Sequence, residues 1–141
     1  MIHLLLTTLL ALYPHSPASA CVRARASRIA NDARAASEAH DVPATLLVAI
    51  GWFESHLGCN PRSGGSWGSP SGRAHRHRAG SAWHTARDLA TSFRVCHSWP
   101  AAVARYRCGL CRCTPPVGYR PRHVLSLVRR LNRAWAAAES R

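Results

Sequence analysis

The segment that most constrains this chain is residues 43–57, PATLLVAIGWFESHL, the most apolar run after residue 20. At about 100° of helical turn per residue, Leu47, Ile50 and Leu57 fall on the same side as Glu54. The pattern predicts a helix that turns a carboxyl group toward the core. Such a group loses hydration in its charged form, so we expect the pKa of Glu54 to be raised, as suits a general acid. A glutamate at the core edge, paired with an arginine, is the alternative.

The 141 residues allow one domain, and residues 1–20 have the features of a secretory signal peptide. Residues 4–12 form an apolar run too short to span a bilayer, and Ala18-Ser19-Ala20 matches the small-residue cleavage pattern. We therefore expect an exported, periplasmic or extracellular protein in which residues 21–141 form one domain without a transmembrane segment. Cys21 directly follows the expected cleavage site and would permit a lipid anchor, although Ala18 does not match a lipoprotein signal.

The charge of the chain predicts an anionic partner. All 19 cationic side chains are arginine, only six are acidic, and the net charge is +13. A polyanionic cell envelope, nucleic acid or a membrane surface would each fit such an excess. For an exported protein the envelope is the leading candidate, and nucleic acid is not expected.

Six cysteines in an exported domain of this size predict disulfides, for which fifteen pairings exist. One segment contains Cys108, Cys111 and Cys113, so at least some of these must bond to Cys21, Cys59 or Cys96. A zinc site on Cys108-x-x-Cys111 with Cys113 and a histidine is the alternative. A single CxxC lacks the second pair that a structural zinc site needs.

Apolar residues recur at helical spacing through the rest of the chain, and no segment alternates with a period of two. We expect helices over residues 21–39, 43–57, 81–96, 98–106 and 119–135, with Asp41 as a cap and Gly58 as a stop. Residues 58–81 are rich in Gly and Ser and predict a long irregular loop. The predicted fold is therefore all-α, with about five helices and disulfide-stapled loops.

Four pieces follow one another in an order that is hard to attribute to chance. They are the apolar helix ending in Glu54-Ser55, the Gly-rich residues 63–68, the helix of residues 101–109, and Gly118-Tyr119. Together they resemble the soluble lytic transglycosylase (SLT) family of the lysozyme-like fold, to which goose-type lysozymes are related. The resemblance covers roughly residues 40–131.

The resemblance implies cleavage of the β-1,4 bond between N-acetylmuramic acid and N-acetylglucosamine in peptidoglycan, with Glu54 as the single catalytic acid. The muramic acid's own 6-hydroxyl would then attack, giving a 1,6-anhydro product. It also implies glycan strands as the partner of a monomer, no cofactor and no metal. Substrate contacts are expected from six further residues: Ser55, Gly65, Trp67, Gly68, Tyr106 and Tyr119.

Two positions depart from the family pattern. Residues 69–71 are Ser-Pro-Ser where the family has Leu-Met-Gln, and Arg107 stands where it has asparagine. Both positions help to hold sugar in the family. Three alternatives stay open: a muramidase-type hydrolase, a non-catalytic basic wall-binding protein, and a basic antimicrobial or nucleic-acid-binding protein.

Some of these residues also have purely structural interpretations. Ser55 could be a helix-end hydroxyl that bonds to backbone, and Tyr106 a core tyrosine. Asp88, the only other acid in the central helices, is expected to face solvent or to pair with an arginine.

Overall fold

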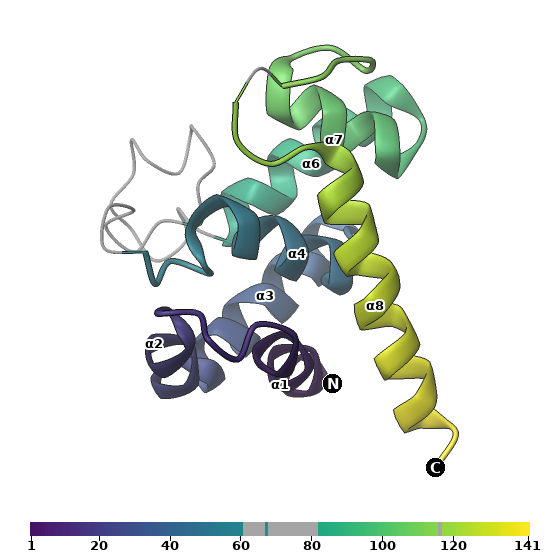
Figure 1. The fold of residues 1–141 in the computed structure, drawn as a ribbon. Helices are drawn as coiled ribbons and strands as arrows, with labels where there is room; N and C mark the ends of the chain where they lie inside the picture. Colours follow the sequence, from purple (N-terminus) through teal and green to yellow (C-terminus); the bar gives the residue numbers. More distant parts are fainter. Residues whose placement is uncertain (61–66, 68–81, 116) are drawn as a thin grey trace.

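The computed structural model describes residues 1–60, 67, 82–115 and 117–141. In this part the chain forms seven helices and no strands, so the predicted all-α class is confirmed (Figure 1). The helices are α1 (Ile2–Leu12), α2 (Ser19–Ala24), α3 (Ala26–His40), α4 (Ala44–Ser55), α6 (Ala82–Cys96), α7 (Trp99–Cys108) and α8 (Pro121–Glu139). The helix predicted over residues 21–39 is divided at Arg25, which separates α2 from α3.

Helix α4 lies at the centre and contacts α1, α3, α6 and α8. It is apolar almost all round, and a helix of that kind is buried on every side. Leu47, Val48 and Ile50 are completely buried although they point in different directions. The exception is its last turn, where Phe53 and Glu54 remain partly exposed.

The structure corrects both predicted ends of this central helix. Asp41 does not cap it but ends α3 in a left-handed conformation, with φ at 53°. Pro43 stands at the N-cap of α4, without a capping side chain. At the other end α4 stops at Ser55, short of the predicted end, because His56 and Leu57 adopt left-handed conformations with φ at 50° and 58°.

The segment predicted as a signal peptide forms a helix that packs into the core. Helix α1 contacts α3, α4 and α8, and Leu5, Leu6 and Leu9 are at most 2% exposed. Removal of residues 1–20 would therefore uncover the apolar surface that these leucines cover. None of the helices in the described part is both long enough and apolar enough to cross a membrane.

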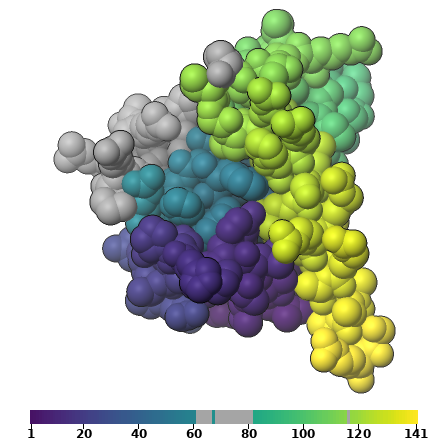
Figure 2. Space-filling view, in the orientation of Figure 1, coloured from purple at the N-terminus to yellow at the C-terminus, as the bar shows by residue number. Residues whose placement is uncertain are grey.

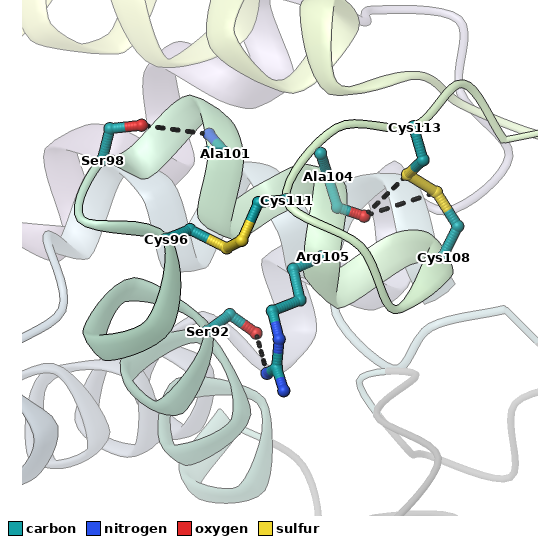
Figure 3. Close-up of a disulfide and its surroundings, with 9 residues drawn as sticks. All are labelled: Ser92, Cys96, Ser98, Ala101, Ala104, Arg105, Cys108, Cys111 and Cys113. Atoms are coloured by element: carbon teal, nitrogen blue, oxygen red, sulfur yellow. Dashed lines mark hydrogen bonds between the residues drawn. A yellow bond between two sulfur atoms is a disulfide. The ribbon is translucent and has the colours of Figure 1, made fainter.

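All six cysteines form disulfides, so the zinc alternative is wrong. The pairs are Cys21–Cys59, Cys96–Cys111 and Cys108–Cys113. As predicted, one cysteine of the crowded segment bonds to an earlier one, because Cys111 is linked to Cys96 at the end of α6. The Cys108–Cys113 disulfide links the same segment to the end of α7 (Figure 3). Because the sulfur of Cys21 is bonded to Cys59, it cannot carry a lipid in this state.

Candidate functional site

The structure brings together Glu54 and Tyr119, two residues that the sequence motifs single out separately. Glu54 lies in the last turn of α4, and its side chain is 10% exposed. The hydroxyl of Tyr119, which precedes α8, donates a hydrogen bond to Oε1 of Glu54. Nη1 of Arg107, near the end of α7, lies 3.9 Å from the same oxygen. With Phe53, these residues are called the Glu54 cluster below.

Arg107 holds the segment that carries Tyr119. Its Nη2 donates to the carbonyl oxygen of Val117 at 2.9 Å, and its Nε donates to that of Tyr119 at 3.3 Å. Its positive charge beside Glu54 also stabilises the ionised carboxylate. Sequence reasoning treated this arginine only as a departure from a family pattern and missed its contacts. The available signal was an arginine in the last turn of a helix, where cations interact with free carbonyl groups.

Phe53 fixes the ring of Tyr119 from the side of α4. The two rings are stacked, with centroids 5.4 Å apart and planes 25° apart. Such aromatic pairs contribute about 0.5–1.5 kcal/mol beyond their burial. The residue before the carboxylate therefore helps to orient the tyrosine that donates to it, a role that sequence reasoning did not assign.

Tyr106 lies beside the cluster with its hydroxyl turned inward. Within the described part neither this hydroxyl nor that of buried Thr85 makes a hydrogen bond of normal geometry, although the two lie near enough to interact. Burial raises the pKa of Tyr106, and the negative charge of Glu54 adds to the effect. The hydroxyl is buried, and its contact with a sugar stays a prediction.

The pKa of Tyr119 is raised as well, first by burial and then by the charge of Glu54 and the hydrogen bond between them. A phenol whose pKa is raised stays protonated at neutral pH. Tyr119 is therefore a permanent donor to the Glu54 carboxyl group.

Ser55 has the structural role that was its alternative interpretation. Its side chain is buried, donates weakly to the carbonyl oxygen of Gly51 at 3.4 Å and accepts from the backbone N–H of Gly58 at 2.9 Å. These bonds close the end of α4. A contact between Ser55 and substrate stays a prediction.

Trp67, for which a substrate contact was predicted, is only 3% exposed. Its indole lies against the backbone of α4, because a Cβ added to Gly51 would fall 2.5 Å from Cε3 of the ring. Contact between this ring and a sugar stays a prediction. Gly65 and Gly68 fall outside the described residues.

The other acids outside α4 have different settings. As predicted, Asp88 pairs with an arginine, Arg87, at 3.2 Å. Asp32 lies 3.8 Å from Arg28 along one helix, and Glu139 accepts from the indole N–H of Trp135. In the described ranges no three histidine, cysteine, aspartate or glutamate side chains gather in a way that could hold a metal ion.

A hollow of about 530 Å³ lies beside the two C-terminal disulfides, which are drawn in Figure 3. It is lined by Cys96, Ser98, Pro100, Ala101, Ala104, Cys111, Arg112, Cys113 and Pro121. No member of the Glu54 cluster contributes to its walls.

Comparisons with protein-family models, with curated proteins and with solved structures find no match for this chain. The family resemblance therefore rests on the sequence motifs alone. The chemistry of the site has to be argued from Glu54 and its neighbours.

Proposed function

We propose that this protein is a peptidoglycan lytic transglycosylase that uses Glu54 as its single acid and base. The observation that carries the proposal is the hydrogen bond between Tyr119 and Glu54, which lie 65 residues apart in the sequence and belong to two of the four motifs. If the motifs matched the family only by chance, the tyrosine of one motif would not be expected to contact the carboxylate of another motif. The all-helical fold is consistent with the lysozyme-like domain that the motifs suggest.

The reaction needs one carboxyl group and no water. Protonated Glu54 gives its proton to the glycosidic oxygen as the bond from that oxygen to C1 of muramic acid breaks. The resulting carboxylate then takes the proton of the 6-hydroxyl while O6 bonds to C1, which closes the 1,6-anhydro ring and returns the proton to Glu54. Glycosidases that hydrolyse the bond usually need a second carboxylate, and Asp88, whose charge also acts on Tyr106, is paired with Arg87.

Two members of the cluster would assist. Tyr119 would hold one carboxyl oxygen in place throughout, since its phenol remains protonated. Arg107 would stabilise the carboxylate in the interval between the two proton transfers.

One observation favours a second candidate, a non-catalytic wall-binding domain. Nη1 of Arg107 lies 3.9 Å from Oε1 of Glu54, and both side chains are largely buried, as in a structural ion pair. In that case the pair would join α4 to α7 as an element of structure. The arginine excess would then supply the attraction to the wall.

The test is incubation of the oxidised protein with purified sacculi, followed by mass spectrometry of the soluble products. The proposal predicts muropeptides that end in 1,6-anhydro-muramic acid, which are lighter by one water than the products of hydrolysis. Asp32→Asn is the matched control, because it removes an acid that pairs with Arg28 on α3, and it should release the same products. Reducing-end products would identify a hydrolase, and an absence of soluble products would favour the wall-binding domain.

A further inference from the structure

The outer side of α8 carries a line of arginines. Helical spacing places three of them opposite the buried residues Val124, Leu127 and Leu131, and all three are exposed. They are Arg122, Arg129 and Arg133, called the α8 arginine face below. The C-terminal end of α8 extends beyond the body of the molecule, which leaves that end of the helix open to a large ligand (Figures 1 and 2).

No acidic side chain neutralises this face. The six acidic residues of the chain all belong to the described part, and none forms an ion pair with any of the three arginines. The only acid on α8 is Glu139, which accepts a hydrogen bond from Trp135. Like charges three and four residues apart destabilise a helix, so this arrangement does not serve the stability of α8. It fits an external anion instead.

The geometry of the face suits an extended anion. At a rise of 1.5 Å per residue, Arg122 and Arg133 lie about 16 Å apart along the axis, with Arg129 between them. The intervals along the axis are about 10 Å from Arg122 to Arg129 and about 6 Å from Arg129 to Arg133, so the three charges form a line and not a compact cluster. One small anion could neutralise only part of such a line.

A membrane surface fits less well. A helix that lies in a bilayer interface directs apolar side chains into the lipid, next to its cationic ones. The large apolar residues Val124, Leu127 and Leu131 of α8 point into the core, and the exposed residues beside the arginines include Ser126 and Asn132. The ligand should therefore be held by charge and hydrogen bonds alone.

We propose that the α8 arginine face binds a linear phosphodiester polymer of the cell envelope. The three disulfides favour a compartment outside the reducing cytosol, where such polymers occur and nucleic acid is scarce. This site is separate from the Glu54 cluster and does not depend on catalysis. It would retain the protein on the envelope whatever Glu54 does.

The test measures binding to immobilised, deacylated poly(glycerol phosphate) across a series of salt concentrations. The variant Arg122→Gln, Arg129→Gln, Arg133→Gln should bind at least tenfold more weakly. In this variant the slope of log affinity against log salt concentration should become shallower by about two units, because each of the three lost phosphate contacts contributes about 0.7. The matched control is Arg23→Gln, Arg25→Gln, Arg34→Gln, which removes the same charge from exposed positions at α2 and α3 and should lose less than twofold.

Three results would overturn the proposal. Equal losses in both variants would mean that the whole charge of the protein acts without a defined site. Tighter binding to a single-stranded DNA oligomer of equal charge would indicate a nucleic-acid site, and tighter binding to phosphatidylglycerol vesicles would indicate a membrane surface.

Two controls separate this proposal from the proposed enzyme activity. Glu54→Gln should bind poly(glycerol phosphate) as the wild type does. The triple α8 variant should still release the wild-type products from sacculi stripped of anionic polymer. Failure of either proposal would therefore leave the other standing.

Discussion

Cζ of Arg107 lies 4.2 Å from the centre of the Tyr119 ring, and the same guanidinium donates to the backbone carbonyl of that tyrosine. A cation over an aromatic face is attracted by the electron density of the ring. One side chain at the end of α7 therefore holds both the ring and the backbone of the residue that donates to Glu54. The position of the Tyr119 hydroxyl depends on Arg107.

Replacing Arg107 should cost stability. Arg107→Met removes two hydrogen bonds from a charged donor that is 19% exposed, so we expect the free energy of unfolding to fall by about 1–3 kcal/mol. Urea unfolding of the disulfide-intact protein measures the change. Arg105→Met is the control on the same helix, because Arg105 makes one long bond, 3.5 Å, to Ser92 (Figure 3). Equal losses in the two variants would show that Arg107 does not hold the segment.

Replacing Tyr119 should affect activity more than stability. Tyr119→Phe keeps the stacking on Phe53 but removes the donor to Glu54. Hydrogen bonds to charged groups are worth about 1.5–3 kcal/mol, so the rate of muropeptide release should fall roughly tenfold to a hundredfold. Tyr13→Phe, in which the replaced ring packs on Trp52, should release products at the wild-type rate. An undiminished rate in Tyr119→Phe would exclude the tyrosine from the mechanism.

The stability of the protein should decline above about pH 10. The ordinary pKa of tyrosine is about 10, and the folded protein raises that of both Tyr106 and Tyr119. Below pH 10 the folded and unfolded chains are both protonated, so the full stability is present. Above it the unfolded chain loses these protons while the folded chain keeps them, which favours unfolding.

Urea midpoints measured between pH 9 and 11 check this expectation. The decline should be smaller in Tyr119→Phe than in the wild type, because one of the two groups no longer titrates. Identical declines in both proteins would contradict the assignment of the effect to Tyr119.

Residues 1–20 should contribute strongly to stability. Burial of a leucine side chain is worth about 1.5–3 kcal/mol, and Leu5, Leu6 and Leu9 are all buried against neighbouring helices. We expect a chain that begins at Cys21 to be less stable than the full chain by about 4 kcal/mol or more. Thermal unfolding of the two oxidised proteins measures the difference. Equal melting temperatures would show that α1 does not contribute to the core, and they would favour the signal-peptide prediction.

The helical class could be predicted because it depends on local periodicity. Apolar residues recur at helical spacing in both α3 and α8, and Ile29, Ala33, Val124 and Leu127 are buried among them. The ends of α4 could not be predicted in the same way. His56 and Leu57 adopt left-handed conformations that side chains disfavour, and local sequence gives little sign of such turns.

The candidate site could be predicted in part. Motifs identified Glu54 and Tyr119, but the contacts of Arg107 and Phe53 depend on how distant helices meet. Burial of Trp67 depends on the missing side chain of Gly51, a steric match between two segments that no spacing rule contains. The cysteine pairing could not be predicted for the same reason, since all fifteen pairings are compatible with the sequence.

The most direct test of the account is the rate at which Glu54→Gln releases soluble products from sacculi. Glutamine keeps the shape of the side chain and can accept the hydrogen bond from Tyr119, but it cannot exchange a proton. Loss of a general acid lowers rates by about 10²–10⁴. The account predicts a fall of that size with sedimentation onto sacculi unchanged, and release at the wild-type rate would contradict it.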